Sequence, residues 1–261
     1  MEKPPDPEME EYADPAAHGL TDDRILGGQL RLLQPADGHR IGQDAILLAA
    51  AVAAQAGELA LEGGAGVGAA SLCLAHRVPG LSVDAIEIDP ALAELCRNNA
   101  ERNGLGDAVE VYCADIANPP YRVTPETYHH VFMNPPFLEA HAAIASPRPR
   151  RANAHRESGV MLRDWIKFAV TMARPGGSIT IIHRVDRMDD LLAALKGRAG
   201  RCEIFPLWPG GAKPAKRLIL RAYKGLDGAM TLHRGLTLHA ADKKYTDEAE
   251  RILRAGQALL F

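Results

Sequence analysis

A glycine-rich segment, residues 62–68, constrains the fold of this chain more than any other feature. It follows a short apolar run and opens a longer apolar stretch, residues 69–75. Glycines at alternate positions, Gly64, Gly66 and Gly68, suit a tight turn from a strand into a helix. They also let a ligand approach the backbone beside the partly positive start of that helix. The segment therefore predicts a strand–turn–helix unit with a ligand at the turn.

Short apolar runs alternate with helix-like stretches along most of the chain. We expect strands at about 58–62, 82–88, 108–113, 129–134, 178–183, 201–207 and 216–224, and helices at about 44–55, 67–77, 90–103, 158–173, 186–198 and 247–258. A hairpin is expected earlier, over 24–34, and a turn over 174–177. Repeated alternation implies an α/β fold with a mostly parallel sheet, helices on both faces, and ligand loops at the carboxyl ends of the strands.

Acidic residues stand at the ends of the second and third expected strands. Glu87 lies about as far beyond the glycines as a carboxylate that binds ribose hydroxyls. Asp115 is placed to accept a hydrogen bond from the amine of a bound adenine, although an ordinary turn aspartate fits equally well. Gly64, Gly66 and Ala69 also satisfy a dinucleotide-binding pattern, so a nicotinamide enzyme is an alternative.

The fourth expected strand ends abruptly at Asn134-Pro135-Pro136-Phe137. Two successive prolines fix φ at about −65°, remove two backbone donors and keep Asn134 out of the α region. A plain loop is the simpler interpretation of two prolines, but the flanking asparagine and phenylalanine make the combination rarer. The rigid corner presents the Asn134 side-chain oxygen and prolyl carbonyls beside an aromatic face, which suits a planar amino group.

Together, these features resemble the class I S-adenosylmethionine-dependent methyltransferases, in the branch that methylates planar amino groups. A closer likeness, to the bacterial tRNA (valine) adenine-N6 methyltransferase group with its NPPF motif, is carried by Gln34-Pro35, Gly38-His39-Arg40, residues 44–49, residues 174–177 and Pro214-Ala215-Lys216-Arg217. The resemblance covers residues 22–261. Gly63 is a departure, because such enzymes usually carry an apolar residue there.

The resemblance implies a Rossmann-like methyltransferase fold, with a seven-stranded, mostly parallel sheet and an antiparallel last strand. It implies S-adenosyl-L-methionine as cofactor, bound by Glu62, Gly64, Gly66, Gly68, Glu87 and Asp115. The expected catalytic residues are Asn134, Pro135 and Phe137. The Asn134 oxygen and the Pro135 carbonyl would accept from the amino group of an adenine, and Phe137 would stack on its ring for about 1–3 kcal/mol. An adenosine in a folded RNA must be turned out of its stack to reach the site, and the resemblance points to a tRNA anticodon loop.

The charge distribution is compatible with an RNA partner. The net charge is −3, but residues 1–20 hold six acidic residues against one lysine and are expected to form a disordered tail. Two basic clusters follow later in the chain. We expect RNA-binding residues at Arg148, Arg150, Arg151 and Arg156 in the first cluster and at Lys213, Lys216 and Arg217 in the second. A solvated charged face is the alternative for either cluster.

Composition predicts a cytoplasmic enzyme with one principal core. The 261 residues are 47% hydrophobic, and no apolar run is long enough to cross a bilayer. No secretion signal is evident, and the four cysteines and ten histidines lack metal-ligand spacing, so no metal is expected. We expect three parts: the tail 1–20, a methyltransferase domain 21–225 that includes the hairpin and first helix, and a capping segment 226–261.

Three alternatives stay open. The same proline corner would accept a glutamine side chain, so one alternative is a protein glutamine-N5 methyltransferase acting on a translation factor. A nicotinamide oxidoreductase would use the glycines and Glu87 but leave the proline corner without a role. A catalytically silent RNA-binding module would use only the basic clusters. The tRNA, its target nucleotide, the oligomeric state, and the roles of His39, Arg40, Asp44 and His183 are left open, with a helix cap expected of Asp44.

Overall fold

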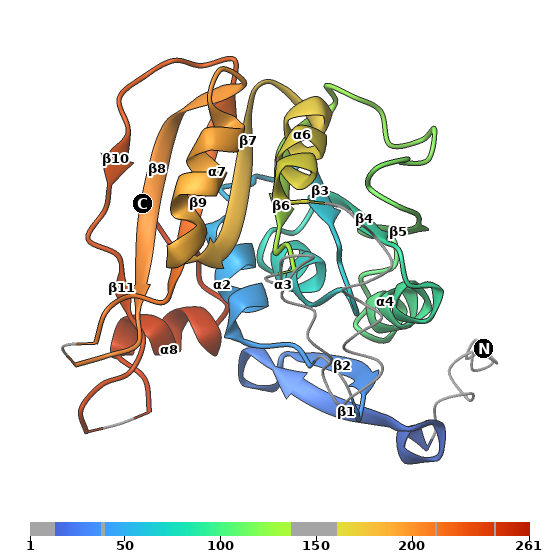
Figure 1. Cartoon of the computed structure of the whole chain (residues 1–261). Coiled ribbons are helices and arrows are strands. Elements are labelled where there is room, and N and C mark those ends of the chain that lie inside the picture. The colour runs from blue at the N-terminus through green and yellow to red at the C-terminus, as the bar shows by residue number, and fades with distance from the viewer. Residues whose placement is uncertain (1–13, 38–39, 137–160, 212, 243) are drawn as a thin grey trace, which may run out of the picture.

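The computed structural model describes residues 14–37, 40–136, 161–211, 213–242 and 244–261. A large twisted sheet forms the centre, with a separate two-stranded hairpin packed against one end (Figure 1). The strands of the sheet are β3 (Leu59–Gly63), β4 (Ser82–Glu87), β5 (Val109–Cys113), β6 (Tyr128–Met133), β7 (Ala173–Arg184), β8 (Ala199–Trp208), β9 (Arg217–Lys224), β10 (Thr231–Leu232) and β11 (Leu236–Thr237).

The order of the seven long strands across the sheet is β8-β9-β7-β6-β3-β4-β5. Strand β9 runs antiparallel to both neighbours, β7 and β8, and the other pairings are parallel. This confirms the Rossmann-like methyltransferase topology with an antiparallel last strand. The short strands β10 and β11 both pair with β8 and extend the sheet to nine strands.

Helices cover both faces of the sheet. They are α2 (Gln43–Ala51), α3 (Ala69–Arg77), α4 (Pro90–Arg102), α6 (Leu162–Met172), α7 (Met188–Leu195) and α8 (Asp247–Leu253), with 3-10 turns η1 (Pro15–His18), η2 (Leu26–Gly28) and η3 (Val185–Arg187). One apolar cluster joins α2, α3, α4 and α8 to the sheet, and a second joins α6 and α7. Neighbouring residues of β6 alternate between the two clusters, as period-two side chains require: Phe132 lies in the first, Val131 and Met133 in the second.

Some element boundaries differ from the sequence expectations. Residues 174–177 form part of β7 instead of a free turn. Helix α2 ends at Ala51, before the expected residue 55, where Val52 adopts extended backbone angles. The Arg77 guanidinium donates to the carbonyls of Ala49 (2.9 Å) and Val52 (2.6 Å) at this end. Helix α8 ends at Leu253, and the chain turns at a positive-φ glycine soon afterwards.

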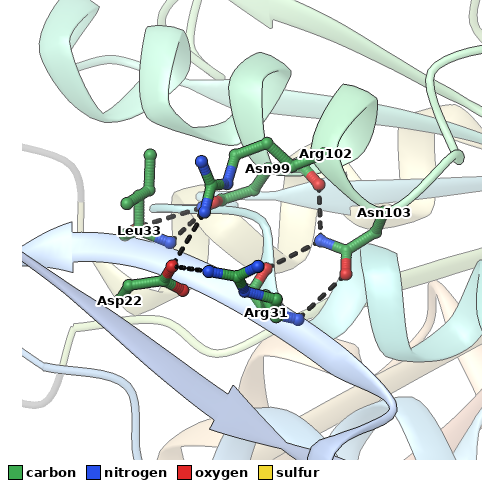
Figure 2. A network of polar contacts seen from close by, with 6 residues as sticks. All are labelled: Asp22, Arg31, Leu33, Asn99, Arg102 and Asn103. Atoms are coloured by element: carbon green, nitrogen blue, oxygen red, sulfur yellow. Dashed lines mark hydrogen bonds and ion pairs between the residues drawn. The ribbon is translucent and has the colours of Figure 1, made fainter. Parts of the chain in front are cut away.

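The hairpin is longer than expected and is fixed to α4. It pairs β1 (Leu20–Ile25) with β2 (Leu30–Pro35), and Figure 2 shows the polar network that holds it. The contacts run from Asp22 to Arg31 and Arg102, from Asn99 to the backbone of Leu33, and from Asn103 to the backbone of Arg31. The hairpin is therefore a fixed part of the protein beside the carboxyl ends of the strands.

Within the described residues, no helix combines the length and apolar character needed to span a membrane. The same part of the chain holds no group of three or more histidine, cysteine or acidic side chains arranged to bind a metal ion.

Candidate functional site

The carboxyl ends of four neighbouring parallel strands bring the expected site residues to one edge of the sheet. Strands β6, β3, β4 and β5 lie side by side and end at Met133, Gly63, Glu87 and Cys113. The proline corner, the glycine loop and the two acidic residues therefore meet there, although they are far apart in the sequence. Such an edge is the ligand-binding position of open α/β sheets.

The glycine loop requires glycine for identifiable reasons. Gly64, Gly66 and Gly68 all have positive φ values, of 70°, 57° and 88°. A Cβ at Gly64 would lie 2.7 Å from the Trp165 ring, and one at Gly68 would lie 2.5 Å from the sulfur of Cys96. At Gly66 the space is open, with no atom within 4 Å of a built Cβ. Two of the glycines thus allow close packing below the loop, and the third leaves room above it for a ligand.

Gly63, the departure noted in the sequence, has a packing reason. A Cβ on this residue would lie 3.1 Å from the Phe168 ring and 3.5 Å from the Trp165 ring. Two aromatic side chains of helix α6 therefore occupy the space that a side chain at residue 63 would need. The strand reaches Gly63 itself, so β3 is not shortened by the substitution.

Glu62 is buried just before the loop. Its carboxylate accepts hydrogen bonds from the backbone amide of Ser71 (2.9 Å) and from the Ser71 hydroxyl, in the first turn of α3. Burial raises the pKa of Glu62 to about 8, and the Ser71 hydrogen bonds oppose that rise. The side chain fixes the start of the helix relative to β3 and places a titratable group under the ligand loop.

Glu87 ties the end of β4 to the glycine loop. One carboxylate oxygen accepts from the Gly66 amide (2.7 Å), and the other accepts from the Asp89 amide (2.9 Å). Burial raises its pKa, and these amides oppose the rise. Each carboxylate oxygen keeps a further lone pair, so Glu87 is oriented to accept from the hydroxyls of a ribose.

Asp115 lies just beyond β5, as expected. Its Oδ1 accepts from the amide of Ala117 (2.8 Å), which is a local turn contact. The turn interpretation and the ligand interpretation are compatible here, because the second carboxylate oxygen is not needed for the turn. Ile88, a residue that the sequence did not single out, is 47% exposed beside Glu87 and offers an apolar surface to a flat ring.

Asn134 follows β6 directly, and its side-chain Oδ1 is buried. Among the described residues no group donates a hydrogen bond to this oxygen. A buried acceptor without a donor is costly, and such groups are concentrated where a ligand completes the bonding. Pro135 is also buried, and Phe137 lies outside the described residues.

The second basic cluster lies at the same edge of the sheet, where β9 begins. Lys213 and Lys216 are exposed, whereas Arg217 donates to the Asp44 carboxylate (2.9 Å) at the start of α2. Asp44 is thus an ion-pair partner, and Gly42 occupies the N-cap position that was expected of it. The first cluster, Arg148, Arg150, Arg151 and Arg156, lies outside the described residues, as does His39.

His183 lies at the carboxyl end of β7, two residues beyond the pairing of Met133 with Ile181. Burial first, and then the positive charge of Arg187, lower its pKa to about 4. The imidazole is therefore neutral at physiological pH. A neutral imidazole does not serve as a cationic contact for phosphate.

Trp165 and Asn99 are site residues that sequence reasoning missed. Trp165 packs under the glycine loop from α6, and Asn99 donates to the carbonyl of Val67 in that loop (3.0 Å). Trp165 is one of only two tryptophans in the chain and lies in an amphipathic stretch. These two features could have marked it as a candidate site residue. Nothing in the local pattern distinguishes Asn99 from an ordinary helix residue.

The sheet topology and the glycine loop at the carboxyl ends of its strands define a class I methyltransferase. The sequence profile of the methyltransferase small domain family matches residues 39–202, and the chain belongs to that family. The cofactor of the family is S-adenosylmethionine, and this chain fits it through two features: the open space at Gly66 and the oriented carboxylate of Glu87.

Known proteins similar to this chain include two relatives of the same name. A tRNA1(Val) (adenine(37)-N6)-methyltransferase from Porphyromonas gingivalis is 32% identical over 158 residues, 58% of this chain, and the chain spans only 61% of that relative's length. One from Dickeya chrysanthemi is 25% identical over 221 residues, covering 82% of this chain and 86% of the relative. The crystal structure of a predicted O-methyltransferase from Agrobacterium tumefaciens superposes with a TM-score of 0.70 at 26% identity, covering 83% of this chain and 98% of that one.

Proposed function

We propose that this protein transfers a methyl group from S-adenosylmethionine to the exocyclic N6 amine of an adenosine in the anticodon loop of a tRNA. The observation that carries the proposal is the buried Oδ1 of Asn134 at the end of β6, which accepts no hydrogen bond from the part of the chain that the structure describes. An acceptor held there requires a donor from the substrate, and an amino group is such a donor. The names of the relatives from Porphyromonas and Dickeya support adenine-N6 as the acceptor and tRNA as the substrate.

The reaction requires that the lone pair of the adenine amine be available for attack, and it does not require that the amine be deprotonated first. The lone pair of an adenine amine is delocalised into the ring, so the amine is a weak nucleophile. Hydrogen bonds from its two N–H groups to Asn134 Oδ1 and to the Pro135 carbonyl favour a pyramidal nitrogen and stabilise the positive charge that develops on it. S-adenosylmethionine supplies the methyl group as a sulfonium electrophile. The N–C bond would form as the S–C bond breaks, S-adenosylhomocysteine would be the leaving group, and the extra proton of the methylated amine would pass to water.

Positioning of the two reactants supplies much of the remaining rate enhancement. The rigid Asn134-Pro135 corner holds the acceptor amine still, and the Glu87–Gly66 contact holds the loop over which the cofactor lies. Phe137 is proposed to stack on the target base, and Asp115 to accept from the adenine amine of the cofactor.

RNA binding is proposed for the basic residues at the same edge. Lys213 and Lys216 are exposed beside the strand ends, where phosphates of a bound loop would pass. Arg217, paired with Asp44, is proposed to act from that fixed position, and Arg148, Arg150, Arg151 and Arg156 to add further phosphate contacts. The proposed division of the chain keeps these residues in the methyltransferase domain, 21–225, with the tail 1–20 before it and the segment 226–261 after it.

Transfer of a labelled methyl group from S-adenosylmethionine to bulk tRNA tests the function. We expect label that ribonuclease releases from the macromolecular fraction, and N6-methyladenosine as the labelled nucleoside on mass spectrometry. Label that survives nuclease and enters protein would support the glutamine alternative instead. A 2′-O-methylated nucleoside would contradict the amine acceptor and agree with the name of the Agrobacterium structure.

A further inference from the structure

Trp165 packs against the glycine loop from helix α6. It lies in the second turn of α6 and is only 8% exposed. The six-membered edge of its indole faces the glycine loop, at 2.7 Å from a Cβ built on Gly64 and 3.5 Å from one built on Gly63. The indole therefore packs against the loop, in the space that a side chain at Gly64 would need.

The indole N–H of Trp165 is buried and has no acceptor among the described residues. An indole nitrogen is a donor only, and buried tryptophan N–H groups usually find a partner. The other tryptophan follows that rule, because Trp208 donates its indole N–H to the Arg234 carbonyl at 3.0 Å. Leaving a buried donor unpaired costs about 1–3 kcal/mol, so the Trp165 N–H points to an acceptor that a ligand brings.

The loop itself offers few free donors to an anionic ligand. Four of its amides already donate inside the protein: Gly64 and Ala65 to the Ile86 carbonyl (2.8 and 2.9 Å), Gly66 to Glu87 (2.7 Å) and Gly68 to the Ala65 carbonyl (2.9 Å). The ionisable side chains of Glu62 and Glu87, which adjoin the loop, are acidic and offer no positive charge to an anion. A carboxylate brought to this loop therefore needs a donor from another element.

We infer that Trp165 binds the amino-acid half of S-adenosylmethionine, its indole N–H donating to the cofactor carboxylate. The carboxylate is the anionic, acceptor-only group of that molecule. The Trp165 N–H is a buried donor without an acceptor in the described part of the chain, and its ring packs against the loop. This assignment rests on the proposed function only in requiring the cofactor. It makes Trp165 a cofactor-binding residue. It also explains the Gly63-Gly64 pair, because a side chain at either position would crowd the Trp165 ring.

Calorimetry with two ligands tests the inference. S-adenosylhomocysteine carries the amino-acid half, and 5′-methylthioadenosine lacks it. We expect Trp165→Phe, which keeps an apolar ring and removes the N–H, to bind S-adenosylhomocysteine roughly 10- to 100-fold more weakly and to bind 5′-methylthioadenosine within about threefold of the parent. Trp208→Phe is the matched control, and it should leave both affinities unchanged. An equal loss for both ligands, or no loss for either, would overturn the assignment.

A second measurement observes the Trp165 N–H directly, in a protein that retains this tryptophan. The Trp208→Phe protein contains a single tryptophan, so its labelled indole N–H gives one nuclear magnetic resonance signal from Trp165. We expect S-adenosylhomocysteine to move that proton downfield, as a new hydrogen bond to a carboxylate requires, and 5′-methylthioadenosine to leave it near its free position. The same shift with both ligands would overturn the inference while leaving cofactor binding intact. A protein that binds neither ligand would overturn the proposed function as well.

Discussion

The side-chain amide of Asn99 donates to the carbonyl oxygen of Val67 at 3.0 Å and so links helix α4 to the cofactor loop. The same side chain accepts from the Leu33 amide (2.7 Å) and donates to the Leu33 carbonyl (2.9 Å) in the hairpin (Figure 2). One fully buried side chain therefore bonds three backbone groups from two segments that are distant in sequence. The hairpin and the loop share this single polar anchor.

Replacing Asn99 with alanine should destabilise the protein more than the same change one turn later. The Asn99→Ala variant leaves buried Leu33 and Val67 groups unsatisfied, so the free energy of unfolding should fall by about 1–3 kcal/mol. Asn103 bonds both backbone groups of Arg31 in the same way but at an exposed position, where water can replace it. Asn103→Ala should therefore cost less than about 1 kcal/mol. Urea unfolding of both variants measures the difference, and equal costs would show that burial of the anchor is unimportant.

Replacing Asn134 with alanine should impair turnover and spare the cofactor. Losing one oriented contact to the developing charge lowers kcat by at least about 10²-fold. The affinity for S-adenosylhomocysteine should change little, because the proposal assigns the Asn134 oxygen to the amine of the substrate and not to the cofactor. Single-turnover methyl transfer to tRNA, with calorimetry of the cofactor product, separates the two quantities. A parallel loss of cofactor affinity would remove Asn134 from the catalytic role.

Glu62 should make the stability of the free protein fall as pH rises. Its folded-state pKa is about 8 against an ordinary value of 4.5, so between these values the folded protein keeps a proton that the unfolded chain has released. The free energy of unfolding therefore decreases from about pH 4.5 towards pH 8. Glu62→Gln keeps an acceptor for Ser71 and removes the titration, so its stability should vary less over this range. Denaturant unfolding at pH 5, 6.5 and 8 makes the comparison, and identical pH profiles for both proteins would contradict the expectation.

Neutralising Lys213 and Lys216 together should weaken RNA binding without changing the chemical step. Both are exposed at the edge where the strands end, so each can contribute a phosphate contact. The KM for tRNA should rise, and the slope of log affinity against log salt should become shallower by roughly 0.7 per lost contact. Lys196 follows α7 at the opposite edge, before β8 begins, and Lys196→Ala is the matched control. A slope that equals that of the control variant would exclude the two lysines from the RNA site.

Sequence patterns were sufficient to predict those features that depend on the backbone preferences of single residues. The glycine loop and the β6 proline corner were predicted because positive φ values and fixed proline φ values are properties of the residues themselves. Glu87 was placed correctly because the end of a parallel strand fixes where its last side chains lie. The role expected of Asp44 was wrong for the opposite reason: its partner, Arg217, begins a strand far along the chain.

The sequence by itself determined the class of fold, the edge of the sheet that carries the site and the residue types offered there, because strand–helix alternation and turn chemistry follow from neighbouring residues. The tertiary structure decided which buried polar groups are satisfied. Asn99 is bonded on every side, whereas Asn134 Oδ1 and the Trp165 N–H have no partner among the described residues. That distinction depends on which distant atoms come within hydrogen-bonding distance, and only packing brings them together.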